Sequence, residues 1–271
     1  MNRVLLGTIG AIAMATSASA ADLAPRPYTK AAPIVAAAYS WSGFYVGVHA
    51  GYAWMDSTDN ITAANAAALV FLAPPPDIAP SLPLDPRGFI GGGQVGYNWQ
   101  ISPTWLIGLE ADFSGTNLNR TVALPGPDDF SRIITANEKM DWFGTVRGRV
   151  GVTFDRTLLY ATGGLAYGHV SLSTALTRIT GAGCAANNCQ NGSITDTRFG
   201  WTVGGGVEWA FADNWSVRGE YLYYDLGTIS HAMTDPQFPA IFNATADLKG
   251  SIARAGLNYK FNWGSAVVAR Y

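Results

Sequence analysis

The chain of 271 residues contains 31 glycines and many aromatic residues, whereas charged residues make up only 13%, about half the fraction usual in soluble domains. Its formal net charge of −2 offers no basic surface and argues against nucleic acid as a partner. The length suits one domain, and no apolar run is long enough for a transmembrane helix.

The first forty residues precede the region that is expected to fold. Residues 1–20 have a short positive start, an apolar core and a small-residue cleavage site, which together indicate a secretory signal peptide. Residues 21–40 are rich in Ala and Pro and predict a flexible periplasmic lead-in.

Alternation of apolar and polar residues with a period of two recurs along the chain and predicts eight strands. One face of each strand is apolar and the other is small, polar or charged, although the facing of the fifth strand is uncertain. Trp and Tyr stand at the strand ends, which is typical of a transmembrane barrel rather than of a soluble sandwich. The predicted strands are 41–54, 88–100, 104–114, 138–154, 157–174, 199–211, 215–227 and 248–261.

The connections between these strands alternate in length. Four long loops, the first at 55–86, alternate with three short turns, as outer-membrane barrels with extracellular loops and periplasmic turns require. The other long loops are 115–137, 176–195 and 228–247. We therefore expect an all-β fold, an eight-stranded antiparallel up-and-down transmembrane β-barrel, over residues 41–261. A C-terminal extension, 262–271, leaves open whether the last strand ends at Phe261 or nearer Tyr271.

Eight charged residues share the inward phase of the predicted strands, and their formal charges cancel. The lumen of an eight-stranded barrel is just wide enough for side chains to fill, so we interpret them as an ion-pair network that plugs the barrel; the alternative is a gated or narrow pore. His49 projects into the same lumen. The predicted network consists of Glu110, Asp112, Arg147, Arg149, Glu208, Arg218, Glu220 and Arg254.

The remaining motifs in the sequence concern a disulfide, a nucleotide site and a haem ligand. Cys184 and Cys189 lie close together, and in an oxidising compartment they predict a local disulfide; two free loop thiols are the alternative. No His or acidic residue beside them supports a metal site. The glycines of 91–96 fit a dinucleotide-binding pattern, but the chain continues there as a strand instead of a helix. His231 is a candidate haem ligand by residue type alone.

Three segments resemble a known family. WSGFYVG at 41–47, GQVGYNW at 93–99 and RAGLNYKF at 254–261 are similar to the small outer-membrane β-barrel proteins of alphaproteobacteria. Members of this family often carry the porin-family label and include the 25–31 kDa surface proteins of Brucella and rhizobia. The resemblance covers nearly the whole mature chain. It implies an OmpA-like eight-stranded barrel without a catalytic residue set.

Two classes of function follow from these patterns. In the first, the chain is a structural envelope and surface-interaction protein of the cell outer membrane, with a largely plugged lumen and loops that meet host or surface ligands. The alternative is a transport protein, either a small porin or a haem-binding uptake component. The expected partners are outer-membrane lipids and the barrel-insertion machinery. We expect no enzymatic activity, no cofactor and no metal.

Overall fold

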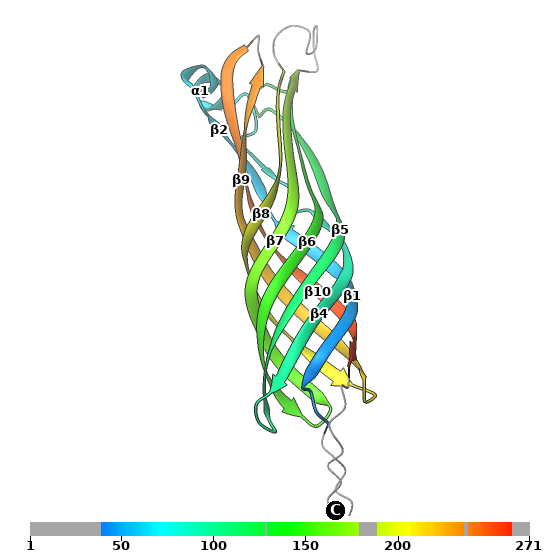
Figure 1. Cartoon of the computed structure of the whole chain (residues 1–271). Helices are drawn as coiled ribbons and strands as arrows, with labels where there is room; N and C mark the ends of the chain where they lie inside the picture. Colours follow the sequence, from blue (N-terminus) through cyan, green and yellow to red (C-terminus); the bar gives the residue numbers. More distant parts are fainter. Residues whose placement is uncertain (1–38, 128, 179–188, 236–237, 262–271) are drawn as a thin grey trace, which may run out of the picture. The chain divides into compact units, whose positions relative to one another are not determined.

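The computed structural model describes residues 39–127, 129–178, 189–235 and 238–261. The predicted signal peptide, most of the lead-in and the C-terminal extension lie outside the described residues. Eight long antiparallel strands form a ring (Figure 1) that closes where β1 pairs with β10, so the predicted fold class is confirmed. The eight strands are β1 (Gly43–Asp56), β4 (Arg87–Gln100), β5 (Trp105–Pro125), β6 (Arg132–Phe154), β7 (Thr157–Arg178), β8 (Gln190–Ala210), β9 (Trp215–Asp235) and β10 (Phe238–Lys260).

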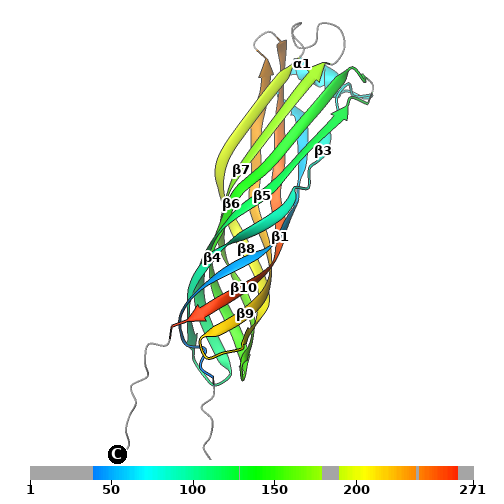
Figure 2. The ribbon, with the colours of Figure 1, turned by 90° about the vertical axis from the view of Figure 1, so that its right-hand side faces the viewer.

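The short turns mark one end of the barrel, which we assign to the periplasm because outer-membrane barrels keep their short turns there. The described chain also enters and leaves at this end (Figure 2), where the Phe261 amide donates to the Phe44 carbonyl at 2.8 Å. Strand β10 ends at Lys260. Among the described residues, no helix is long and apolar enough to span a membrane.

Two belts of outward aromatic rings bound an apolar band on the lower barrel. The belt near the periplasm includes Trp215 and Tyr259, whose ring centroids are 5.0 Å apart. The outer belt includes Tyr52 and Phe89, at 5.4 Å, and Phe113 with Trp142, at 5.6 Å. The outward residues between the belts, such as Val95, Ile107 and Val203, are exposed. Such a band with aromatic girdles is the membrane-spanning surface of a barrel.

Above the outer belt the wall of the barrel continues, and all four predicted long loops are wrong in extent. Residues 115–137 and 228–247 lie mostly in extended arms of β5, β6, β9 and β10, and β7 and β8 continue to residues 178 and 190. The alternation persists in these arms with its sense reversed, since apolar side chains now face inward and polar ones outward. Leu172 and Ile229 are fully buried there, whereas Lys139 and Ser230 are exposed.

The predicted first loop, 55–86, is also a folded part of the wall. Strand β2 (Thr58–Ala63) takes over from β1 in pairing with β10, and β3 (Ser81–Pro83) pairs with β2. Between them, the short helix α1 (Ala66–Leu72) lies at the outer end of the barrel in both views (Figures 1 and 2). Asn65 caps this helix, because its side-chain oxygen accepts from the Ala68 amide at 3.1 Å. We call residues 57–86 the mouth segment.

Candidate functional site

The lumen of the membrane-spanning part holds the eight charged residues predicted from the sequence. Each of them is at most 5% exposed. Arg147 on β6 lies at the centre and reaches three carboxylates: Glu110 at 2.5 Å, Asp112 at 3.1 Å and Glu220 at 3.0 Å. Its Nε also donates to the Thr145 hydroxyl at 2.8 Å. One guanidinium thus joins carboxylates from strands on opposite sides of the lumen.

Two further arginines, on β9 and β10, bind the same carboxylates. Arg254 donates to Asp112 at 2.9 Å and to Glu220 at 2.7 Å, and Arg218 donates to Glu110. Each carboxylate therefore accepts from at least two guanidinium groups. Buried charges are tolerable only when they are paired and hydrogen-bonded, and the four-to-four balance of the network meets this condition.

Arg149 and Glu208 extend the network toward the periplasm, with an ion pair of 3.0 Å between them. Tyr45 connects this pair to the centre, because it accepts from Arg149 at 3.0 Å and donates to Glu110 at 2.6 Å. Tyr160 lies with its ring centroid 4.0 Å from the Arg149 guanidinium and donates to Glu220 at 3.1 Å. The charged layer is thereby cross-linked around and along the lumen.

Uncharged polar side chains on the same inward phase of the predicted strands complete this layer. Asn258 donates to Glu208 at 2.8 Å, and His49 contacts Gln94 at 2.5 Å and Ser114 at 2.7 Å. His49 is thus part of the lumen network, as its inward phase predicts. Tyr160 was missed because the fifth predicted strand alternates poorly, although the phase of Leu158 and Thr162 would have placed it inward.

An apolar layer lies at the periplasmic end of the lumen. Trp41 is 2% exposed and packs with Leu106, Leu158 and Ala210. Its amide donates to the Gln100 side chain at 3.0 Å. The prediction that Trp41 begins the first strand is therefore wrong: the strand begins at Gly43, and Trp41 turns inward beneath it, where its ring is removed from water.

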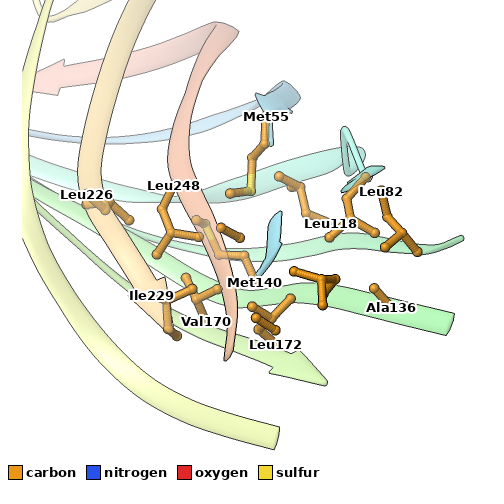
Figure 3. Close-up of a cluster of buried hydrophobic side chains, with 14 of the residues drawn as sticks. Met55, Leu82, Leu118, Ala136, Met140, Val170, Leu172, Leu226, Ile229 and Leu248 are labelled. Carbon is orange, nitrogen blue, oxygen red and sulfur yellow. The ribbon is translucent and has the colours of Figure 1, made fainter. Parts of the chain in front are cut away.

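A larger apolar layer lies above the charges, inside the extracellular arms. Figure 3 shows side chains from opposite walls that meet in this cluster, among them Leu118, Met140, Leu172 and Ile229. The mouth segment contributes Leu82, which is fully buried. Ile252 on β10 shares the inward phase of Arg254 and belongs to this cluster. Along the described lumen the buried side chains therefore form three layers: apolar, charged and apolar.

The remaining predicted sites have different outcomes. Cys184 lies outside the described residues, so its disulfide with Cys189 stays a prediction, which a thiol assay on protein from oxidising conditions would test. His231 was placed in a loop, but it lies in strand β9 and is half-buried beside Gly192. The glycine-rich stretch 91–96 lies within strand β4, which excludes the strand-to-helix turn of a dinucleotide site.

The closed ring of strands and the lipid-facing band define the class: an outer-membrane β-barrel protein. Residues 8–261 match the model of the family described as "Outer membrane protein beta-barrel domain". The chain belongs to this family, and its location is the cell outer membrane.

Several curated proteins are similar along most of the chain. The 31 kDa outer-membrane immunogenic protein of Brucella melitensis is 34% identical over 96% of this chain and all of its own length. The 25 kDa outer-membrane immunogenic protein of Brucella abortus is 24% identical over 91% of this chain and 92% of its own. Among solved structures, OprG from Pseudomonas aeruginosa aligns with a TM-score of 0.46 and 11% identity, over 81% of this chain and 96% of its own.

Proposed function

We propose that this chain is a sealed, non-conducting barrel that serves as a structural envelope protein and presents its extracellular arms to surface or host ligands. The observation that carries the proposal is the charged layer, in which four arginines and four carboxylates bind one another across the lumen. A pore of this width would need some of these groups to be free for water and ions.

The apolar layers on both sides of the charges add to the proposal. An ion that crossed the lumen would have to pass the Trp41 layer, the ion pairs and the cluster around Leu172. Apolar constrictions exclude ions by dewetting. A small porin is therefore the less favoured function.

The arms form the surface that extracellular ligands would contact. The outward side chains of β6, β7 and β8 above the aromatic belt are mostly short hydroxyl and amide groups, including Asn137, Ser173 and Ser193, which are neighbours across the strands. The names of the Brucella relatives describe those proteins as immunogenic. We extend this property to the arms of the present chain as part of the proposal.

The experiment is reconstitution of the folded barrel in planar bilayers, with haem titration on the same sample. The wild-type protein should give little steady current and no saturable haem binding, whereas Arg218→Ala should give more or noisier current. A large, stable wild-type conductance would instead support the porin function. Stoichiometric haem binding that is lost in His231→Ala would support the uptake function.

A further inference from the structure

The mouth of the barrel contains a buried carboxyl group that the charge network does not use. Glu138 on β6 is completely buried. Among the described residues no hydrogen bond of good geometry reaches either of its carboxylate oxygens, although the Ser57 hydroxyl lies close enough to favour the ionised form. The adjacent Lys139 points outward and is exposed. Glu138 therefore lies above the membrane-spanning band, inside the extracellular arms.

The groups that face Glu138 are acidic or neutral. The mouth segment presents Ser57, Asp59 and Asp85 to it, and β9 presents the Tyr224 hydroxyl. Arg120 is the backbone partner of Glu138 on β5, but its side chain is exposed and lines a pocket with Asp85. No contact joins Arg120 to the Glu138 carboxylate in the described part of the chain. A buried carboxylate without a counter-ion is costly, and such a group neutralises by taking up a proton.

Asp59 connects this acidic cluster to the position of the mouth segment. It lies on β2, is completely buried, and accepts a hydrogen bond from Thr174 on β7 at 2.8 Å. This bond crosses the interior of the barrel from the mouth segment to the opposite wall. The second oxygen of Asp59 and the hydroxyl of Ser57 are buried without partners among the described residues. Two ionised carboxylates at this place would repel each other with little solvent screening.

We propose that Glu138 binds a proton that keeps the mouth segment seated, and that loss of this proton releases the segment from the barrel mouth. Protonated Glu138 is a neutral group that the apolar cluster tolerates. Ionised Glu138 would repel Asp59 and Asp85, and the element that can move away is the mouth segment, since β6 is held by neighbouring strands on both sides. The charged layer below remains closed in both states, so the proposal goes beyond the sealed barrel.

The direction of the pH dependence follows from the buried carboxyl. Burial raises the pKa of Glu138 from 4.5 to about 7, and the charges of Asp59 and Asp85 add to the rise, while the Ser57 hydroxyl opposes it. Burial also raises the pKa of Asp59. A raised acid pKa favours the seated state at low pH, and this advantage is lost as the pH rises from about 4.5 through about 7. With a tenfold change for each pKa unit, the seated-to-released ratio should fall about 300-fold.

Hydrogen exchange measured by mass spectrometry on the folded, full-length barrel in lipid nanodiscs tests the proposal. After correction for the pH dependence of intrinsic exchange, protection of residues 57–86 should fall by up to about 75-fold between pH 5 and pH 9, because at pH 5 a carboxyl group with a pKa of 4.5 is already mostly ionised in the released state. In Glu138→Gln, which removes the charge and keeps the shape, protection should change little with pH. Asp141→Asn, an exposed site on the same strand, should behave as the wild type.

Protection of 57–86 that is equal at both pH values in the wild type, or that falls equally in Glu138→Gln, would overturn the proposal. Should the variant fail to fold, infrared titration of the wild-type barrel replaces it. A protonated carboxyl band that persists to about pH 7 supports the proposal, and its complete loss by pH 5.5 contradicts it. Neither readout depends on conductance, so the outcome is separate from that of the sealed-barrel function.

Discussion

At the scale of single residues, Arg147 is the side chain on which most of the charged layer depends. It bonds to Glu110, Asp112 and Glu220, whereas Arg218 bonds directly to Glu110. Glu110 would keep Arg147 and Arg149 if Arg218 were lost. The two arginines are therefore not equivalent, although the sequence places them in the same inward phase.

Arg147→Ala should destabilise the barrel by about 3–5 kcal/mol, because it leaves buried carboxylates with fewer partners. Arg218→Ala should cost less, near the lower end of that range. Urea unfolding of the barrel in lipid vesicles measures both values. An equal or larger loss for Arg218→Ala would mean that Arg147 is not the centre of the network.

Two glycines on β4 differ in the space around them, because Gly96 faces the lumen and Gly93 faces the lipid. A Cβ added at Gly96 would lie 2.4 Å from the Tyr45 side chain, whereas one at Gly93 would find no atom closer than 3.5 Å. Gly96→Ala should therefore destabilise the barrel by about 1–3 kcal/mol. Gly93→Ala should be neutral or slightly stabilising. Thermal unfolding of the two variants tests this difference, and similar melting temperatures would show that the lumen is not crowded at Gly96.

At the scale of elements, the eight spanning strands follow from the sequence because their environments differ on the two faces. Lipid selects apolar side chains on one side and the lumen selects polar ones on the other, so alternation identifies both the strand and its facing. The eight network residues were placed inward by this argument alone. The lengths of the turns predicted the antiparallel order.

The extracellular arms were not predictable by the same argument. Above the aromatic belt the outer face meets water and the inner face packs on apolar neighbours, so the sense of the alternation reverses. Around Asn119 and Ser230 the arms contain polar outward residues and turn-forming residues, a composition that is also typical of loops. The mouth segment was missed for a further reason: β2 has only six residues and is defined by its pairing with β10, which depends on tertiary contacts.

The lower apolar layer makes a prediction about elements. Trp41→Ala removes most of a buried ring and should cost about 3–5 kcal/mol, yet it should leave the current in planar bilayers unchanged, because the charged layer still closes the lumen. This variant should therefore lose stability without gaining conductance. A rise in steady current in Trp41→Ala would show that the periplasmic layer, rather than the charges, is the seal.

At the scale of the whole molecule, the barrel has two cores of opposite character. In the membrane, the lumen is charged and the outside is apolar; beyond the membrane, the inside is apolar and the outside is polar. The resulting arms stand on the spanning barrel as a packed extension of its wall (Figure 1). A packed, water-facing surface of this kind supports the proposed surface-interaction role.

The central claim is that side chains fill the lumen and leave no continuous path for water. The most direct test is the osmotic water permeability of proteoliposomes that contain the folded wild-type barrel, measured by stopped-flow light scattering. The sealed barrel predicts a permeability equal to that of protein-free liposomes of the same lipid, with the same high activation energy. A permeability that rises in proportion to the amount of barrel, with a low activation energy, would contradict it.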